Sequence, residues 1–217
     1  WSSDVCSSDL GTKAIELVTN GLTFGGSGAN TVNGIIASTP SSATATLDKD
    51  GSGTLILNAV NTYTGITTIN AGTINAQNNA ALGAITANTV VANGAALEVQ
   101  GALTGLAEPI TINGAGVSGV TGAGSIRSVS GVNVITGAVT LNTASTISSY
   151  GTTTTDSLVI RTGVINTGVN ALTTFANGGM HISGVISGTG GTVIKTGTDT
   201  LLLSGSNTYD GLTTVSA

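Results

Sequence analysis

The sequence has little charge, few aromatic side chains and a single cysteine. Charged residues make up 7% of its 217 residues, whereas they make up about a quarter of an average globular domain. The five lysines and arginines are dispersed along the chain, and the formal net charge is −5. Nucleic-acid binding needs clustered cations that displace phosphate counterions. We therefore expect no nucleic-acid partner.

Long apolar runs are also missing. Glycine, asparagine, threonine or serine interrupts every hydrophobic stretch well before the ~18 to 20 residues that a membrane-spanning helix needs, so we expect no membrane insertion by this segment. Disordered chains are poor in β-branched residues, whereas this chain is rich in valine, isoleucine and threonine. Those side chains pack well on a pleated surface, so they predict an almost wholly β structure.

The first ten residues differ from everything that follows. Residues 1–10 contain the only tryptophan and the only cysteine, and Ser-Ser-Asp occurs twice within them. The stretch resembles a translated sequencing-library adapter; the alternative is a genuine polar N-terminus. We expect residues 1–10 to be non-native and residues 11–217 to form one unit. On that interpretation the unit has no disulfide or cysteine metal site, and the absence of a secretory signal says nothing about localisation.

An internal repeat is the strongest signal in the chain. Residues 54–71, TLILNAVNTYTGITTINA, align without a gap with residues 200–217, TLLLSGSNTYDGLTTVSA. The alternation in Thr-Leu-x-Leu predicts a strand with two leucines on one face. Asn61 and Gly65 both tolerate positive φ, so the segment between them is predicted to be a tight turn before a second strand. A weaker echo of the Asn-Thr-x-x-Gly pattern occurs at residues 30–35.

The spacing of the other strand-like runs defines the fold class. They recur roughly every 8 to 12 residues, which is typical of an all-β fold; they span residues 85–91, 96–99, 132–141, 157–161 and 180–186. A sandwich core usually contains large aromatic residues, whereas a narrow solenoid is filled by stacked aliphatic residues and threonine. We predict a single elongated β-solenoid of about ten coils, each of ~20 residues and spaced ~4.8 Å apart.

These patterns resemble a known family. Residues 188–217 follow the autotransporter-associated β-strand repeat, with Gly-Gly, then Lys195, Thr-Leu-x-Leu and Asn-Thr-Tyr-x-Gly in order, and residues 47–75 fit the same pattern. Asp199 stands where glycine is usual. The resemblance implies a right-handed parallel β-helix in the passenger region of a type V secreted protein. It further implies an extracellular, cell-surface location, with anchoring in the outer membrane by a C-terminal barrel outside this chain.

The function implied by the resemblance is structural or adhesive and non-catalytic. The expected partners are host-cell or matrix glycans and proteins, or further copies of the chain. We expect no catalytic, cofactor-binding or metal-binding residue. The alternative is a carbohydrate-active β-helix, such as a polysaccharide lyase or hydrolase, which needs a carboxylate pair or basic residues beside acids. Glu98 and Glu108 are candidates for neighbouring coils, and Arg127 and Arg161 are candidates for a similar stack.

Two short motifs resemble ligand loops. Asp48, Asp50 and Ser52 occupy the first oxygen positions of a calcium loop, but position 12 is Ala59 and no helix is expected on either side, so a turn is favoured. Residues 114–119 match G-x-G-x-x-G, which needs a following helix to bind a dinucleotide. Further glycines follow instead, so a loop is favoured.

The remaining candidate residues are isolated. His181 is the only histidine and has no nucleophile elbow near it, so we expect an ordinary strand residue. Threonine ladders at residues 196–200 and 152–155 do not recur at a coil period, and strand propensity explains them. Tyr63 and Tyr209 are expected to cap the core, with Asn61 or Asn207 as hydrogen-bond partner.

Overall fold

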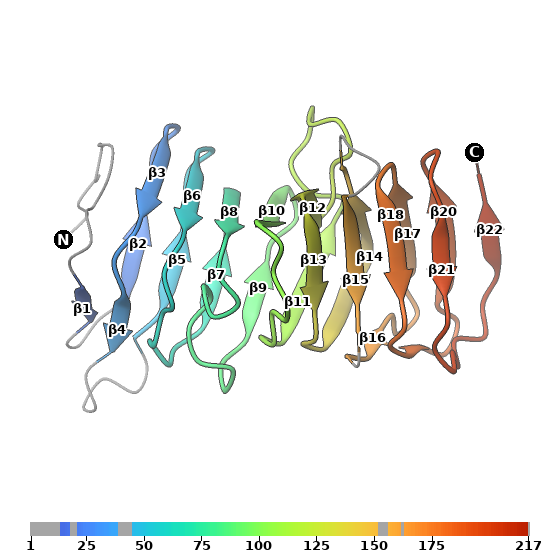
Figure 1. Cartoon of the computed structure of the whole chain (residues 1–217). Coiled ribbons are helices and arrows are strands. Elements are labelled where there is room, and N and C mark those ends of the chain that lie inside the picture. Colours follow the sequence, from blue (N-terminus) through green and yellow to red (C-terminus); the bar gives the residue numbers. More distant parts are fainter. Residues whose placement is uncertain (1–13, 18–20, 39–44, 152–155, 162, 217) are drawn as a thin grey trace.

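The computed structural model describes residues 14–17, 21–38, 45–151, 156–161 and 163–216. All regular elements in these segments are β-strands, and every strand pairing in them is parallel (Figure 1). No helix of the described segments is long and apolar enough to cross a membrane. The predicted all-β parallel solenoid is confirmed, whereas residues 1–10 lie outside the described segments.

The strands form three rows, and each coil passes through the rows in order. The first row contains β2 (Leu22–Phe24), β5 (Leu47–Lys49), β7 (Thr67–Ile69), β9 (Thr89–Val91), β11 (Ile110–Gly114), the start of β14 (Val139–Ser149), β16 (Ile165–Asn166) and β19 (Ile186–Ser187). The second row contains β3 (Ala29–Val32), β6 (Thr54–Leu57), β8 (Gly72–Ala76), β10 (Ala95–Gln100), β12 (Ile126–Ser130), the end of β14, β17 (Ala171–Ala176), β20 (Thr192–Thr196) and β22 (Thr213–Val215). The third row contains β1 (Ile15–Leu17) and β4 (Ile36–Ser38), and later β13 (Val132–Ile135), β15 (Ser157–Ile160), β18 (Gly179–Ile182) and β21 (Leu201–Leu203).

The coils are longer than the sequence suggested. Paired first-row positions are 20 residues apart between Leu47 and Thr67, but 29 apart between Ile110 and Val139. The longest coil contains an irregular loop between β11 and β12, which projects beyond the strand ends at the top of Figure 1. The chain therefore forms about eight coils, and the prediction of about ten is wrong, because loops add residues without adding coils.

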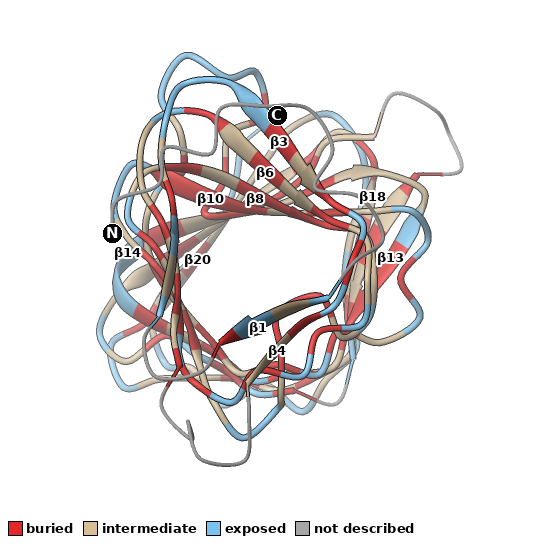
Figure 2. Cartoon of the chain, turned by 90° about the vertical axis from the view of Figure 1, so that its left-hand side faces the viewer, coloured by how far each residue is buried: buried red, intermediate tan, exposed pale blue. Residues whose placement is uncertain are grey.

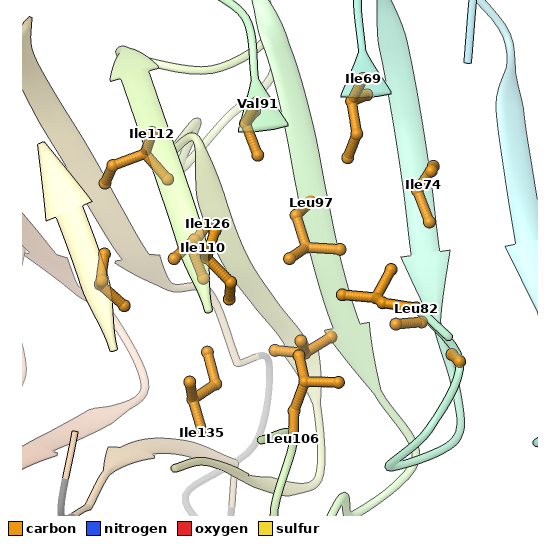
Figure 3. Close-up of a cluster of buried hydrophobic side chains, with 14 of the residues drawn as sticks. Ile69, Ile74, Leu82, Val91, Leu97, Leu106, Ile110, Ile112, Ile126 and Ile135 are labelled. Carbon is orange, nitrogen blue, oxygen red and sulfur yellow. The ribbon is translucent and has the colours of Figure 1, made fainter. Parts of the chain in front are cut away.

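The core is a continuous stack of aliphatic side chains. Alternate residues of a strand face opposite sides, so β17 buries Leu172, Thr174 and Ala176 and turns the residues between them outward. Figure 2 shows buried residues along all the walls of the cross-section, alternating with intermediate and exposed ones. Equivalent residues of successive coils lie above one another, as do Ile74, Leu97 and Ile126 in the second row (Figure 3).

The repeat contains no tight turn. Asn61, Tyr63 and Gly65 are all buried while the residues between them are exposed, as in a strand. The stretch bends only at Gly65 and occupies the third-row position of its coil. Gly65 does not have a positive φ. Glycine is required because an added Cβ would lie 2.3 Å from the carbonyl oxygen of Ala45 in the preceding coil. The predicted strand–turn–strand module is therefore wrong at its centre.

The weak echo at residues 30–35 has no structural counterpart in the repeat. Asn30 lies within β3 of the second row and pairs with Leu55, whereas Asn61 lies in the third-row position of the next coil. The two segments are similar in sequence but lie on different sides of the solenoid.

Candidate functional site

The structure does not bring the two carboxylates, or the two arginines, considered for carbohydrate chemistry into paired strand positions. The strand neighbours of Glu98 are Asn75 and Arg127, whereas Glu108 is buried near the end of the third-row stretch. Arg127 has Glu98 and Ser148 beside it, and Arg161 follows β15 in the third row. The structure therefore pairs neither Glu98 with Glu108 nor Arg127 with Arg161, the neighbours considered for a carbohydrate-active site.

The segment that resembles a calcium loop is the end of a strand and a turn. Asp48 lies within β5 and accepts a hydrogen bond from the Thr46 hydroxyl at 2.9 Å, and Asp50 accepts one from the Asn70 amide at 2.8 Å. Gly51 has a φ of 75°, which a turn requires. In the described residues no group of three or more acidic, histidine or cysteine side chains is placed to hold a metal ion.

The other candidate motifs have structural roles. The glycine motif at 114–119 opens the irregular loop between β11 and β12, so its interpretation as a loop is confirmed. His181 lies in β18, with Nε2 2.7 Å from the Ser204 hydroxyl in the next coil. Thr196 lies in β20 and donates to the Thr174 carbonyl at 3.2 Å. The threonines at 152–155 lie outside the described residues.

A charged and aromatic cluster lies on the outward side of the second row. Arg127 Nη1 is 2.6 Å from Glu98 Oε1, and the guanidinium lies over the Tyr150 ring, 4.7 Å from its centroid. The other Glu98 oxygen accepts a hydrogen bond from Asn75 Nδ2 at 3.0 Å, and the same amide lies 3.0 Å from Gln100 Oε1. Carboxylate, guanidinium, amide and aromatic groups therefore converge here from successive coils.

The loop between β11 and β12 covers this cluster. The Ser125 hydroxyl closes its base on the Asn113 and Gly114 carbonyls, at 2.9 and 2.6 Å, and the Ser148 hydroxyl donates to the Gly122 carbonyl at 2.7 Å. Ala96 faces outward but is only 4% exposed. A cavity of about 10 Å³ remains between the loop and the ion pair, which is room for about one water molecule.

An open groove lies beside the base of the loop, at the corner between the first and second rows. Its volume is about 510 Å³, within the range of small-ligand sites. Its lining has amide, hydroxyl and aliphatic groups and no charged side chain: Thr68, Asn70, Val90, Ala92, Asn93, Asn113, Gly114, Thr143 and Ala144. The groove and the covered cluster are the candidate recognition surfaces, and Tyr150 and Asn75 were not singled out from the sequence.

The two copies of the repeat make the same contacts. Asn61 Oδ1 accepts the Ile36 N–H of the preceding coil at 2.8 Å, and Asn207 Oδ1 accepts the Ile186 N–H at 2.9 Å. The Tyr63 hydroxyl lies 2.6 Å from that of Thr67, and the corresponding distance from Tyr209 to Thr213 is 2.7 Å. Asparagine was predicted to be the hydrogen-bond partner of each tyrosine. In the structure a threonine hydroxyl is that partner, and the asparagine bonds the preceding coil instead.

The repeat lysines bind backbone carbonyls at the corner that follows their strand. Lys49 ends β5 in the first row, and Lys195 lies in β20 in the second row. Lys49 is fully buried, and its ammonium donates to the carbonyls of Asp50 and Gly51, both at 2.8 Å, and of Ala71 at 3.3 Å. Burial lowers the pKa of Lys49, and the nearby Asp50 charge partly opposes this. Lys195 makes the matching bond to Gly197 at 2.6 Å. The sequence placed Lys195 within the repeat pattern but gave no sign of the carbonyls that these lysines bind.

The comparisons agree with this shared geometry. The family model described as passenger-associated-transport-repeat matches residues 47–76 and 193–217. The chain contains autotransporter passenger repeats. The Adhesin BmaC autotransporter of Brucella suis biovar 1 (strain 1330) is 35% identical over 133 residues, which cover 58% of this chain and 4% of that protein. No solved structure matches the chain. The family resemblance seen in the sequence is confirmed, and passenger homology implies a secreted, cell-surface location.

The two passenger repeats are rotated by one row relative to each other. In the first repeat β6 lies in the second row and β7 in the first, whereas the equivalent β21 lies in the third row and β22 in the second. The coils between them have unequal lengths, so the distance between the repeats is not a whole number of coils. Outward residues at equivalent repeat positions therefore face different sides of the solenoid.

Replacing Lys49 with methionine should lower the free energy of unfolding by about 2 kcal/mol. The aliphatic stem is kept, but three carbonyls lose a charged donor. Hydrogen bonds to a charged group are worth about 1.5 to 3 kcal/mol each, and losing the desolvation cost of the buried ammonium offsets part of that sum. Denaturant unfolding at one fixed pH measures the change. Lys195→Met, at a half-buried position of the second passenger repeat, should cost less. Equal costs at the two positions would contradict the role of burial.

Proposed function

We propose that this chain is a structural and adhesive segment of an autotransporter passenger region, exposed at the cell surface and without catalytic activity of its own. The observation that carries the proposal is that the passenger repeats build a parallel solenoid by joining coil to coil, through Asn61 and Lys49. A related protein is named an adhesin, which supports the adhesive part.

A solenoid presents outward side chains at regular spacing, and this suits surface recognition rather than a closed active site. The expected partners are glycans or proteins of a host cell or its matrix. Glycoside hydrolysis needs two carboxyl groups on either side of the bond, but the Glu98 carboxylate is paired with Arg127 instead. This pairing supports a non-catalytic role for the cluster.

Adhesion of coated beads tests the proposal. Beads that carry the purified chain are expected to attach to epithelial monolayers or matrix-coated wells in greater number than albumin-coated beads. Attachment no greater than that of albumin would contradict the adhesive function. Turnover of a polysaccharide by the same chain, abolished in Glu98→Gln, would overturn the non-catalytic assignment.

A further inference from the structure

The outward side of the second row gathers groups that are scarce elsewhere in the chain. Asn75, Glu98, Arg127, Ser148 and Phe175 occupy one register position in successive coils. Tyr150 follows two residues after Ser148, so it projects near the same line. Aromatic residues are only 3% of the sequence, so two aromatic rings beside an ion pair make this surface distinctive.

The loop between β11 and β12 occupies the aromatic surface with backbone rather than with large side chains. A Cβ added to Gly122 would lie 2.2 Å from Cδ2 of Tyr150 and 3.1 Å from Cε1 of Phe175. Gly116, Gly119 and Gly122 all have positive φ, a conformation that other residues rarely adopt. Only glycine at position 122 therefore lets the loop lie this close to the rings.

The closed loop leaves a buried donor without a partner. Arg127 Nε is buried and has no hydrogen-bond acceptor, although its guanidinium bonds Glu98 and lies 3.4 Å from the Thr121 carbonyl. Buried donors in folded proteins nearly always have partners, because an unmet donor is destabilising. The loop thus covers the guanidinium without offering Nε an acceptor, and a ligand hydroxyl placed there would do so.

The chemistry of the uncovered surface matches a sugar ring. Aromatic rings offer an apolar face for the C–H groups of a pyranose, and the paired carboxylate and guanidinium offer an acceptor and donors for adjacent hydroxyls. Because Glu98 and Arg127 neutralise each other, an acidic sugar gains no net attraction. We propose that the second-row surface around Tyr150, Glu98 and Arg127 binds a neutral saccharide, and that the glycine loop is a lid over it.

This assignment names a ligand class for the adhesive function proposed above and rests on it. Two variants are expected to change the affinity for saccharide in opposite directions. Tyr150→Leu removes the ring under the sugar, so saccharide binding should fall at least about tenfold. Gly122→Ala strains and displaces the lid, so binding should strengthen several-fold, since apparent affinity rises with the fraction of molecules in the competent state.

Matched controls separate these effects from damage to the fold. Gly26→Ala introduces the same residue at a positive φ of 87°, but in open space before β3, three coils from Glu98. Tyr209→Leu makes the same tyrosine change in the second passenger repeat. Both should bind saccharide as the parent chain does, and circular dichroism melting of all four variants reports folding directly.

The experiment is saturation-transfer NMR of the full chain with lactose, cellobiose and N,N′-diacetylchitobiose, with 3′-sialyllactose as the acidic comparison. The proposal predicts binding of at least one neutral sugar, strengthened in Gly122→Ala and lost in Tyr150→Leu. No neutral sugar binding to either the parent chain or Gly122→Ala overturns it, as does binding of sialyllactose alone. Bead adhesion that persists in Tyr150→Leu without sugar binding would remove this site and leave the adhesive function standing.

Discussion

Glu108→Gln should stabilise the chain by roughly 3 kcal/mol at pH 8 and by almost nothing at pH 4. Glu108 is 2% exposed, and neither of its carboxylate oxygens has a hydrogen-bond partner. Burial raises the pKa of Glu108 to about 7. Burial and, to a smaller extent, the charge of Glu108 raise the pKa of the Tyr63 hydroxyl, so this neighbour stays neutral.

The direction of the pH dependence follows from the raised pKa. Between the unfolded value of about 4.5 and the folded value of about 7, the folded state binds more protons. Stability due to Glu108 is therefore fully present below pH 4.5 and is lost as pH rises through 7. Glutamine keeps the shape of the neutral acid and cannot ionise, so it should remove this loss.

Urea unfolding at several pH values between 4 and 8 measures the effect. The exposed Glu16 provides a matched control, because Glu16→Gln makes the same change where solvent surrounds the carboxyl group. That control should leave the slope of stability against pH unchanged. A stabilisation by Glu108→Gln that is the same at every pH would show that charge burial is not its cause.

Asn61→Ala should lower the free energy of unfolding by about 3 kcal/mol. The Asn61 side chain accepts from the Ile36 N–H at 2.8 Å and donates to the Ala81 carbonyl at 2.6 Å, so it joins the coil before and the coil after its own. Alanine leaves both backbone groups without this partner at a position only 3% exposed. Each unmet buried group costs about 1 to 3 kcal/mol.

The second passenger repeat supplies the control for this prediction. Asn207 accepts from Ile186 in the same way but is only half-buried, so Asn207→Ala should cost less than half as much. Thermal and urea unfolding of the two variants, measured side by side, test the difference. A similar cost at both positions would mean that asparagine acts through its own coil and not through the bridge between coils.

The repeat residues show how far sequence reasoning reached and where it stopped. Alternation placed Leu55 and Leu57 on a buried face, and the structure has both fully buried. Asparagine and glycine suggested a turn between Asn61 and Gly65, yet the residues there alternate between buried and exposed as in a strand. Their actual roles, a bridge between coils and a close approach to Ala45, depend on a neighbouring coil that local propensity does not describe.

The candidate site was less predictable than the fold. Strand neighbours of Glu98 are 23 residues before it, at Asn75, and 29 residues after it, at Arg127. Such unequal spacing cannot be derived from a regular period, because it depends on the length of the loop between β11 and β12. The two carboxylates considered from the sequence are therefore not paired in the structure, and Tyr150 was missed.

The sequence by itself determined the all-β solenoid and its passenger repeats, because residue type and alternation act locally and recur along the chain. The tertiary structure alone decided which side chains meet across coils: Glu98 with Arg127 and Tyr150, and Lys49 with the carbonyls of its corner. It also decided that the two repeats face different sides. These features depend on the summed lengths of coils and loops, and a change in any one of them rotates every later residue around the axis.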